Sequence, residues 1–267
     1  MNVSINQIVL TLCFVCCLTA VFSRLILKVN WPERFLRTNA FGARIPVTFG
    51  IVPAFGLSAV MGVTHRIAIP AALLILGFSL IGYLDDVYGS PTYRGIRGHL
   101  TALRNGTFTT GLLKLVASPL MAGIFSLYTH GLQSWVAYLN IIMIAASSNA
   151  FNLLDLRPGR SQGFAVITLL ILLPFVQLPV AVGSILVLLI TIIPDARAKV
   201  MMGDSGAIAI GTGVALVVIA SSNILVAVAY TLAAVTLNVV AEKYSLGKLI
   251  SQNIVLNKID GLLGRRS

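Results

Sequence analysis

Long apolar segments follow one another along almost the whole chain, and they constrain the fold more than any other feature of the sequence. A helix needs about 20 mostly apolar residues to cross the hydrocarbon core of a bilayer. Hydrophobic residues make up 57% of the 267 residues and charged residues only 10%, whereas soluble domains carry about 25% charged residues. The sequence therefore predicts one all-α membrane domain, a polytopic helix bundle.

Nine candidate spans can be marked. They lie at about residues 5–23, 46–64, 67–84, 111–128, 134–151, 163–177, 179–194, 206–221 and 224–241. The apolar run 163–194 contains Pro174 and Pro179, and as one straight helix it would reach about 48 Å, against a hydrocarbon core of about 30 Å. We therefore predict a hairpin of two short spans that turns near Pro179.

The positive charges agree with this division. No positive charge precedes the first apolar segment, whereas Arg24 and Lys28 follow it, which favours an N-terminus outside. The segments then predicted inside are 24–45, 85–110, 152–162, 195–205 and 242–267. Together with Lys114, they hold every one of the 19 Lys and Arg residues except Arg66. The net charge of +11 is thus explained by topology, and no nucleic-acid partner is needed.

We expect residues 1–241 to form the transmembrane catalytic domain and residues 242–267 to form a cytoplasmic amphipathic tail. All eight acidic residues also fall on the inner side, although acidic residues contribute little to orientation. Either shared chemistry gathers them there, or the outer loops are too short to carry charge. The three cysteines lie within the first apolar segment, without a neighbouring His or acid, and are expected to pack there.

The first motif with chemical potential is GYLDDVYG, in which Asp85 and Asp86 end the third span. Two adjacent carboxylates repel each other, and the negative end of the helix dipole adds to the repulsion. A divalent cation or a shared proton would relieve it. The alternative is an ordinary solvated start of a loop.

The second motif is SSNAFNLLDLRPGRSQG, in which Asn149, Asn152 and Asp155 are spaced by three. On a helix this spacing makes one polar stripe leading to the inner surface. The stripe either binds a ligand or joins helices through hydrogen bonds. The Pro-Gly pair that follows breaks the helix and displays Arg157 and Arg160, which are good phosphate partners.

The third motif is PDARAKVMMGDSGAIAIG, where Asp204 and Ser205 stand at the start of the eighth span. A helix N-terminus offers free N–H groups to a diphosphate, and Gly203 allows the backbone to come close to a ligand. An Asp beside a phosphate site is a suitable ligand for Mg²⁺. The alternative is that Asp204 only caps the helix.

The segments GYLDDVYG, NAFNLLD and KVMMGDSGA occur in this order and on the same predicted side of the membrane. In these respects the chain resembles the polyprenyl-phosphate N-acetylhexosamine-1-phosphate transferases, glycosyltransferase family 4. This family includes the phospho-MurNAc-pentapeptide translocase and the GlcNAc-1-phosphate transferases of bacterial envelope synthesis. The resemblance covers about residues 24–221.

The resemblance implies a multi-pass enzyme of the bacterial cytoplasmic membrane that makes precursors for cell-wall polymers. It would transfer a sugar-1-phosphate, with an N-acetylated hexosamine as the sugar, from a UDP-sugar to polyprenyl phosphate, releasing UMP. It also implies Mg²⁺, with Mn²⁺ as a substitute, because two anionic reactants must meet. The expected partners are the lipid phosphate, the UDP-sugar and the membrane, and a homodimer is left open.

The resemblance also implies roles for individual residues. We expect Asp85, Asp86 and Asp204 to be catalytic and to bind the metal, with deprotonation of the lipid phosphate as an alternative role for the Asp85–Asp86 pair. The expected substrate-binding residues are Asn149, Asn152, Asp155, Lys114, Arg157, Arg160, His99 and Gly203.

The chain departs from the family pattern in three places. The loop after Asp155 reads LRPGR where the family continues Asp-Gly-x-Asp-Gly, the family's histidine-rich motif is missing, and so is its tenth span. We expect Arg157 and Arg160 to take the place of the histidines. One alternative is therefore a catalytically impaired relative that binds lipid carrier or acts as a scaffold. A transporter is a second alternative, but no Asp, Glu, Lys or Arg lies in the middle of a predicted span.

Overall fold

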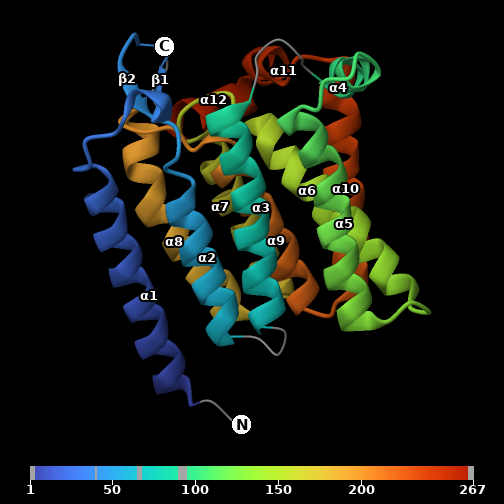
Figure 1. The fold of residues 1–267 in the computed structure, drawn as a ribbon. Coiled ribbons are helices and arrows are strands. Elements are labelled where there is room, and N and C mark those ends of the chain that lie inside the picture. The colour runs from blue at the N-terminus through green and yellow to red at the C-terminus, as the bar shows by residue number, and fades with distance from the viewer. Residues whose placement is uncertain (1–3, 40, 65–67, 90–94, 264–267) are drawn as a thin grey trace.

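The computed structural model describes residues 4–39, 41–64, 68–89 and 95–263, which fold almost entirely into helices (Figure 1). In chain order the elements are α1 (Ile5–Ile26), a 3-10 turn (Glu33–Phe35), β1 (Leu36–Thr38), β2 (Arg44–Pro46), α2 (Ile51–Thr64), α3 (Ala68–Tyr88), α4 (Gly95–Arg104), α5 (Thr110–His130), α6 (Trp135–Leu154), α7 (Arg160–Leu172), a 3-10 turn (Leu173–Phe175), α8 (Leu178–Ala196), α9 (Gly203–Ala220), α10 (Ile224–Lys243), α11 (Leu246–Gln252) and α12 (Ile254–Leu263).

Seven helices within the described ranges are long and apolar enough to cross a membrane: α1, α3, α5, α6, α8, α9 and α10. Two shorter apolar helices, α2 and α7, accompany them. The predicted all-α bundle is confirmed, and its apolar helices are those of a multi-pass membrane protein.

The long apolar run 163–194 is divided into two helices, as its prolines predict. The backbone leaves the α-helical path at Leu173, with Pro174 in the short 3-10 turn that follows α7. Helix α8 then starts with Pro179 in its first turn, where a missing N–H costs nothing because that N–H would have no partner in the helix.

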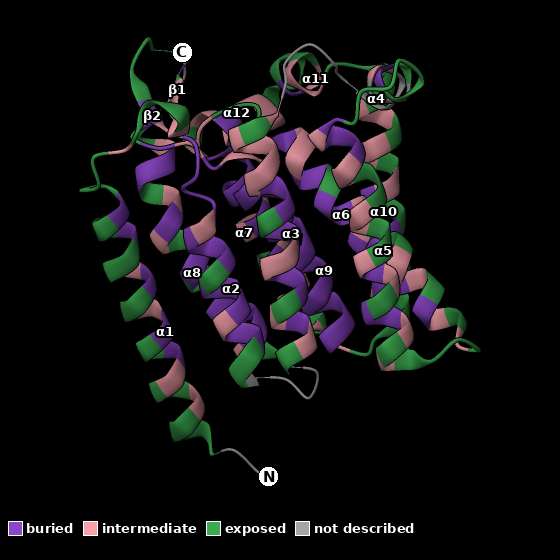
Figure 2. Cartoon of the chain, in the orientation of Figure 1, coloured by how far each residue is buried: buried purple, intermediate pink, exposed green. Residues whose placement is uncertain are grey.

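Helix α9 forms the centre of the bundle. It packs against α2, α3, α6 and α7, and every residue from Ser205 to Ala220 is buried, as the continuous purple of α9 in Figure 2 shows. The peripheral helices instead present large apolar side chains outward, among them Leu10 of α1, Leu120 of α5 and Leu225 of α10, which are 60–79% exposed. Apolar faces of this kind are suited to contact with the hydrocarbon chains of lipids.

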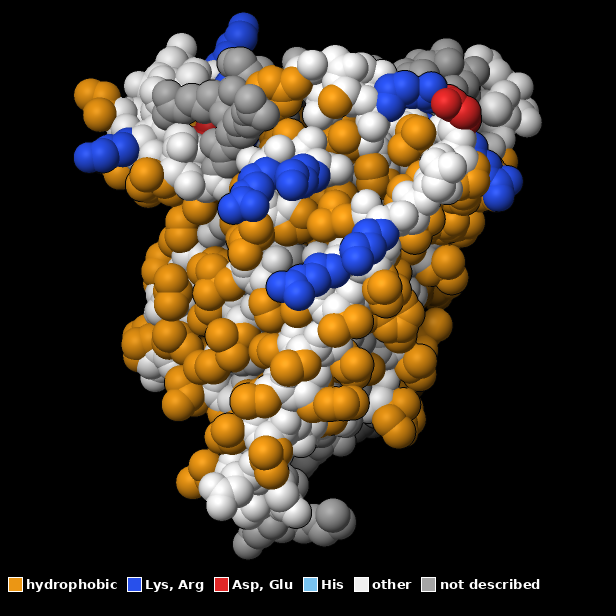
Figure 3. All heavy atoms as spheres, turned by 90° about the vertical axis from the view of Figure 1, so that its left-hand side faces the viewer, with side chains coloured by type: hydrophobic (Ala, Val, Ile, Leu, Met, Phe, Trp, Pro, Cys, Tyr) orange, Lys and Arg blue, Asp and Glu red, His pale blue; other side chains and the backbone are white. Residues whose placement is uncertain are grey.

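The two ends of the bundle differ. Helix α1 begins at one end, whereas the β1–β2 hairpin, α4, α11 and α12 gather at the other (Figure 1). On the face shown in Figure 3, Lys and Arg side chains occupy the upper part, above a mainly hydrophobic surface. The hairpin pairs Arg37 with Ile45 in antiparallel register. The predicted tail consists of α11 and α12, and α10 extends two residues into it.

Candidate active site at the ends of three helices

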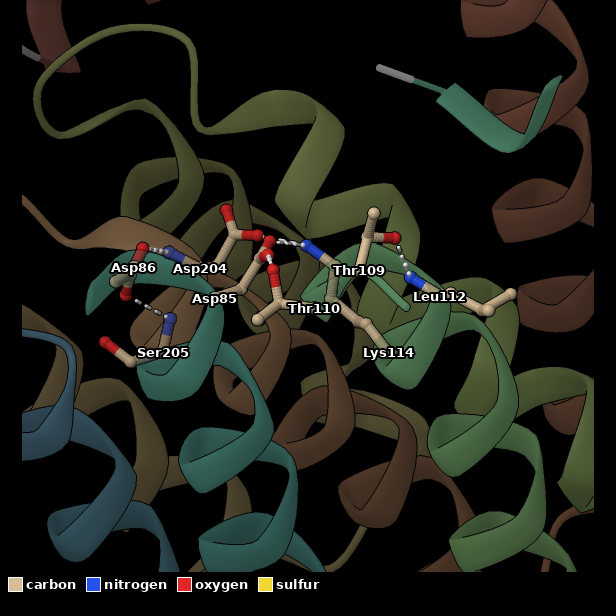
Figure 4. Close-up of polar contacts among 8 residues, drawn as sticks. All are labelled: Asp85, Asp86, Thr109, Thr110, Leu112, Lys114, Asp204 and Ser205. Atoms are coloured by element: carbon tan, nitrogen blue, oxygen red, sulfur yellow. Dashed lines mark hydrogen bonds and ion pairs between the residues drawn. The ribbon is translucent and has the colours of Figure 1, made fainter. Parts of the chain in front are cut away.

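The last turn of α3 meets the first turns of α5 and α9 at the end of the bundle that carries the hairpin (Figure 4). Helices α3 and α9 approach closely because Gly82 has no side chain. A Cβ atom at Gly82 would lie 2.5 Å from the carbonyl carbon and oxygen of Asp204. This close approach brings the Asp pair of α3 beside the start of α9.

Lys114 of α5 bridges two carboxylates from different helices. Its Nζ donates to Oδ2 of Asp85 at 2.7 Å and also to Oδ2 of Asp204. The hydroxyl of Thr110 donates to the other oxygen of Asp85. The Asp85, Lys114 and Asp204 side chains are only 21–28% exposed, so the three charges interact with less solvent screening than a surface pair would. We call Asp85, Thr110, Lys114 and Asp204 the Lys114 cluster.

Asp86 has a different environment from its neighbour Asp85. Its two carboxylate oxygens accept the backbone N–H groups of Asp204 and Ser205, at 2.8 Å and 2.9 Å. Asp86 therefore caps the N-terminus of α9, where a negative charge is stabilised by free N–H groups and by the helix dipole. Adjacent residues on an α-helix point about 100° apart, which explains why the two aspartates serve different partners.

Gly203 allows this cap to form. Its φ is 64°, a left-handed conformation that a residue with a side chain rarely adopts. A Cβ atom there would lie 2.6 Å from Oδ2 of Asp86. The capping alternative considered for Asp204 thus belongs to Asp86, and the Asp204 side chain turns to Lys114 instead.

Asp155 follows α6 directly, as the residue that caps its C-terminus. Loss of solvent around its carboxyl group, together with the nearby carboxylates of Asp195, Asp204 and Asp86, raises the pKa of Asp155 well above its usual value, and Arg160 only partly opposes this. The raised pKa thus reflects, besides burial, repulsion between Asp155 and carboxylates of α8, α9 and α3. A cation bound there would relieve the repulsion.

The two asparagines of the predicted stripe have separate environments. The Asn149 side chain donates to Asn238 of α10, and Asn238 in turn donates to the carbonyl of Ala146 at 2.8 Å. Asn149 thus joins two helices, which is the alternative the sequence left open. Asn152 is partly buried, and its side chain makes no hydrogen bond within the described part of the chain.

Arg160 and Arg157 both contact Asp260 of α12. Arg160 is 1% exposed, and its Nε and one terminal nitrogen donate to the two oxygens of Asp260 at 2.5 Å and 2.9 Å. Arg157, which is more exposed, donates to Oδ2 of Asp260 at 3.2 Å. The pairing occupies Arg160 and leaves only Arg157 open to solvent.

A second carboxylate fixes the same loop from inside the bundle. Asp195, which is buried at the end of α8, accepts the N–H of Gly159 at 3.0 Å and the side chain of Gln162 at 3.2 Å. The loop after Asp155 is therefore attached to both α8 and α12.

Four residues contribute to this arrangement that the motifs did not single out as site residues: Thr110, Arg37, Asp195 and Asp260. Arg37 of β1 donates to the backbone carbonyl of Asp86 at 2.8 Å, which ties the hairpin to the end of α3. Thr110 and Asp195 lie at the edges of predicted spans, whereas Arg37 lies within the first inner segment and Asp260 within the tail. Position in the sequence does not reveal the partner of any of the four.

One expected substrate-binding residue, His99, belongs to α4, but its side chain lies outside the described part of the structure. No group of three or more His, Cys, Asp or Glu side chains in the described ranges is arranged to hold a metal. The Lys114 cluster nevertheless presents two carboxylates, and Mg²⁺ is commonly bound by one or two carboxylates together with substrate phosphates and water. The donor set therefore fits a magnesium ion that binds with its substrate.

Residues 68–222, which contain the Lys114 cluster and the loop after α6, match the family model described as glycosyl transferase family 4. A comparison with curated proteins gives no match.

Proposed function

The chain belongs to glycosyl transferase family 4, and we propose that it transfers a sugar-1-phosphate from a UDP-sugar to polyprenyl phosphate. We propose an N-acetylated hexosamine as the sugar and UMP as the second product. The observation that carries the proposal is the Lys114 ammonium group held between the carboxylates of Asp85 and Asp204. Two anionic reactants need both a cation and metal-binding carboxylates at the place where they meet.

In the proposed reaction an oxygen of polyprenyl phosphate attacks the β-phosphorus of the UDP-sugar. The bond from that phosphorus to the oxygen bridging the two phosphates breaks, and UMP leaves with the bridging oxygen. Lys114 exchanges its carboxylate contacts for the phosphate oxygens and binds them as the negative charge redistributes. Where the lipid phosphate still carries a proton, Asp85 is placed to accept it.

We propose that Asp85 and Asp204 hold Mg²⁺, with Mn²⁺ as a substitute. Lys114 contacts one oxygen of each carboxylate, and this supports the pair as a site for positive charge. The bound ion would neutralise charge on the phosphoryl oxygens. Asp86 contributes indirectly, because it fixes the start of α9 on which Asp204 stands.

We assign the nucleotide sugar to the end of α6. Asn152 has side-chain hydrogen-bonding capacity that the described residues leave unused, and Asp155 is repelled by the carboxylates of Asp204 and Asp86 near the start of α9. Arg157 is the arginine of the following loop that is open to solvent, and we propose it as a phosphate ligand. We do not assign this role to Arg160, because its buried guanidinium group is paired with Asp260.

We propose that the lipid substrate reaches Asp85 along an apolar groove between α2 and α3. The groove has a volume of about 280 Å³, and Phe55, Leu80 and Tyr83 are among its lining residues. Tyr83 lies on α3 two residues before Asp85, so the groove reaches the last turns of α3, on a different side of that helix from Asp85. A polyprenyl chain needs such an apolar path, whereas the nucleotide arrives through water.

The proposed topology has nine crossings, an N-terminus outside and a cytoplasmic C-terminus in the bacterial cytoplasmic membrane. It is supported by the separation of the start of α1 from the end that carries the hairpin, α4, α11 and α12 (Figure 1). On this topology α2 and α7 cross together with the seven longer helices. The Lys114 cluster would then face the cytoplasm, where UDP-sugars are found.

The test uses purified full-length protein with polyprenyl phosphate, Mg²⁺ and a panel of UDP-sugars, scored for UMP release. We expect turnover with one or a few N-acetylated sugars and none with chelator. Substitution of Asp204 by Asn serves as the inactive control. If no UDP-sugar yields UMP while the protein still binds the lipid phosphate, the transferase proposal fails. The catalytically impaired, lipid-binding alternative would then take its place.

A further inference from the structure

A second polar feature lies on the flank formed by α1 and α8, away from the Lys114 cluster. Both helices end at the same end of the bundle and pack against each other (Figure 1). Between their C-terminal ends is a groove with a volume of about 420 Å³. We call it the basic groove, because its lining includes Arg24, Arg197 and Lys199.

The three cations of the basic groove have no anionic counterpart within it. No acidic residue lines the groove. Arg24, Arg197 and Lys199 are exposed, and their side chains make no hydrogen bond or ion pair within the described ranges. The groove therefore offers three positive charges from two helices to one external anion.

The backbone that carries two of these cations is fixed. Ala198, between Arg197 and Lys199, has a φ of 54°, and its carbonyl accepts the side chain of Asn39 at 3.2 Å. The N–H of Lys199 donates to the carbonyl of Pro194 at 3.0 Å. The turn after α8 thus holds the two basic residues in a defined position relative to α1.

Apolar walls continue the groove toward the body of the bundle. On that side Ala20 of α1 and both Ile190 and Ile193 of α8 line it, and Ile193 is 51% exposed. Farther along α8, Leu189 and Leu186 are also partly exposed, at 45% and 39%. Figure 3 shows this flank, with Lys and Arg side chains crossing it above a mostly hydrophobic surface.

Basic residues near helix C-termini and on the inner side of a membrane protein have general causes, the helix dipole and the positive-inside rule. Neither cause requires a hollow that brings three cations together, nor apolar walls below them. A free phosphate ion would use the cations and leave the walls unused. A phospholipid with an anionic head group uses both, because its charge lies directly above its acyl chains.

We propose that the basic groove binds the phosphate head group of an anionic phospholipid. The phosphate lies among Arg24, Arg197 and Lys199, and the acyl chains lie along the exposed apolar sides of α1 and α8. Cationic side chains beside apolar surface at a membrane interface select lipids of negative charge. The site does not depend on the proposed transferase reaction, whose cluster comes from α3, α5 and α9.

The test measures lipid binding to the full-length protein in detergent by native mass spectrometry, with melting temperature as a second readout. The probes are phosphatidylglycerol, phosphatidylcholine with the same acyl chains, farnesyl phosphate and inorganic phosphate. One variant carries Arg24→Gln, Arg197→Gln and Lys199→Gln. The matched control carries Lys243→Gln, Lys248→Gln and Lys258→Gln, three exposed lysines at the same end of the bundle.

We expect the wild type to bind phosphatidylglycerol at least tenfold more tightly than phosphatidylcholine. The groove variant should lose this preference and its lipid-dependent rise in melting temperature, whereas the control variant should retain both. A variant with Arg24→Lys and Arg197→Lys keeps the charges and should retain binding, which separates charge from misfolding.

Three results would overturn the proposal. Equal binding of the two phospholipids would remove the role of head-group charge. Equal losses in the groove variant and the control variant would reduce the effect to net charge. Groove-dependent binding of farnesyl phosphate or inorganic phosphate, without binding of phosphatidylglycerol, would assign the groove to the carrier lipid or to a free anion.

Discussion

The buried guanidinium group of Arg160 forms a two-point ion pair with Asp260, a residue 100 positions later in the chain. The pair attaches α12 to the loop that follows Asp155. The contribution of the pair to stability is measurable mainly when one partner is removed, because the other is then left as a buried, unpaired charge. Asp260 is thereby part of the support for the candidate site.

Asp260→Asn should lower the free energy of unfolding by about 3–5 kcal/mol, the usual range when one partner of a buried pair is lost. Thermal unfolding of the detergent-solubilised protein would measure the loss. Lys258→Gln changes an exposed charge of the same helix and should have little effect. The double variant Arg160→Met with Asp260→Leu should recover most of the stability, since it removes both charges. An unchanged melting temperature in Asp260→Asn would show that α12 does not depend on the pair.

Asp204→Asn and Asp86→Asn should separate catalysis from capping. Asp86 makes the cap of α9, so Asp204→Asn should fold normally while UMP release falls by orders of magnitude. Asp86→Asn removes the negative charge and one of two acceptor oxygens, and should cost roughly 1–2 kcal/mol of stability. Melting temperature and turnover, measured on the same preparations, decide between the roles. Full turnover in Asp204→Asn would end the metal assignment for that residue.

Lys114→Gln should make the protein more sensitive to Mg²⁺. Without the ammonium group, the Asp85 and Asp204 carboxylates face each other with no cation between them. Added Mg²⁺ should therefore raise the melting temperature of the variant more than that of the wild type, while turnover falls because a phosphate ligand is gone. Lys243→Gln, an exposed substitution, is the control. If Mg²⁺ does not change the melting temperature of the variant, this result would argue against a metal site between the two carboxylates.

The pH dependence of stability should show the raised pKa of Asp155. Its pKa in the folded protein is raised above the unfolded value of about 3.9, so the folded state binds the proton more tightly than the unfolded state does. The stabilisation from this proton is complete below the unfolded pKa and is lost as the pH rises through the folded pKa. In the presence of chelator, Asp155→Asn should thus be neutral in acid and stabilising at higher pH. The readout is melting temperature across a pH series, with Glu242→Gln as an exposed control. A pH-independent difference between wild type and Asp155→Asn would contradict the raised pKa.

Reporter fusions would test the proposed orientation. Fusions near residues 158, 200 and 260 should report a cytoplasmic location, and fusions near residues 131 and 222 an external one. The fusion near residue 200 is the most informative, because it follows the hairpin of α7 and α8. An external signal there would mean that α7 and α8 do not both cross, and the nine-crossing topology would fail.

Much of the fold follows from hydrophobicity alone. Apolar length locates the long helices, and the prolines at 174 and 179 divide the run that became α7 and α8. The short helices at the predicted inner end are harder: the sequence pattern predicts no helix within residues 85–110, where α4 lies, and does not divide the amphipathic tail into its two helices, α11 and α12. Short helices depend on local contacts that a period of 3.6 residues does not specify.

The site was predictable only in part, for a related reason. Topology brings the ends of α3, α5 and α9 to one side, so the approach of Asp85, Lys114 and Asp204 could be expected. The direction of each side chain could not. Asp86 turns to the N–H groups of α9, Asn149 turns to α10, and Arg160 turns to α12. In each case the partner is distant in sequence, and only tertiary packing selects it.

The burial of α9 from Ser205 to Ala220 has a consequence for how the protein is made. Four of the helices that pack around it, α2, α3, α6 and α7, precede it in the chain and so reach the membrane earlier during synthesis. On leaving the insertion machinery, α9 therefore enters a partly assembled ring of protein. Substitutions in this helix should act first on assembly, and slow entry of α9 would expose its earlier neighbours to degradation.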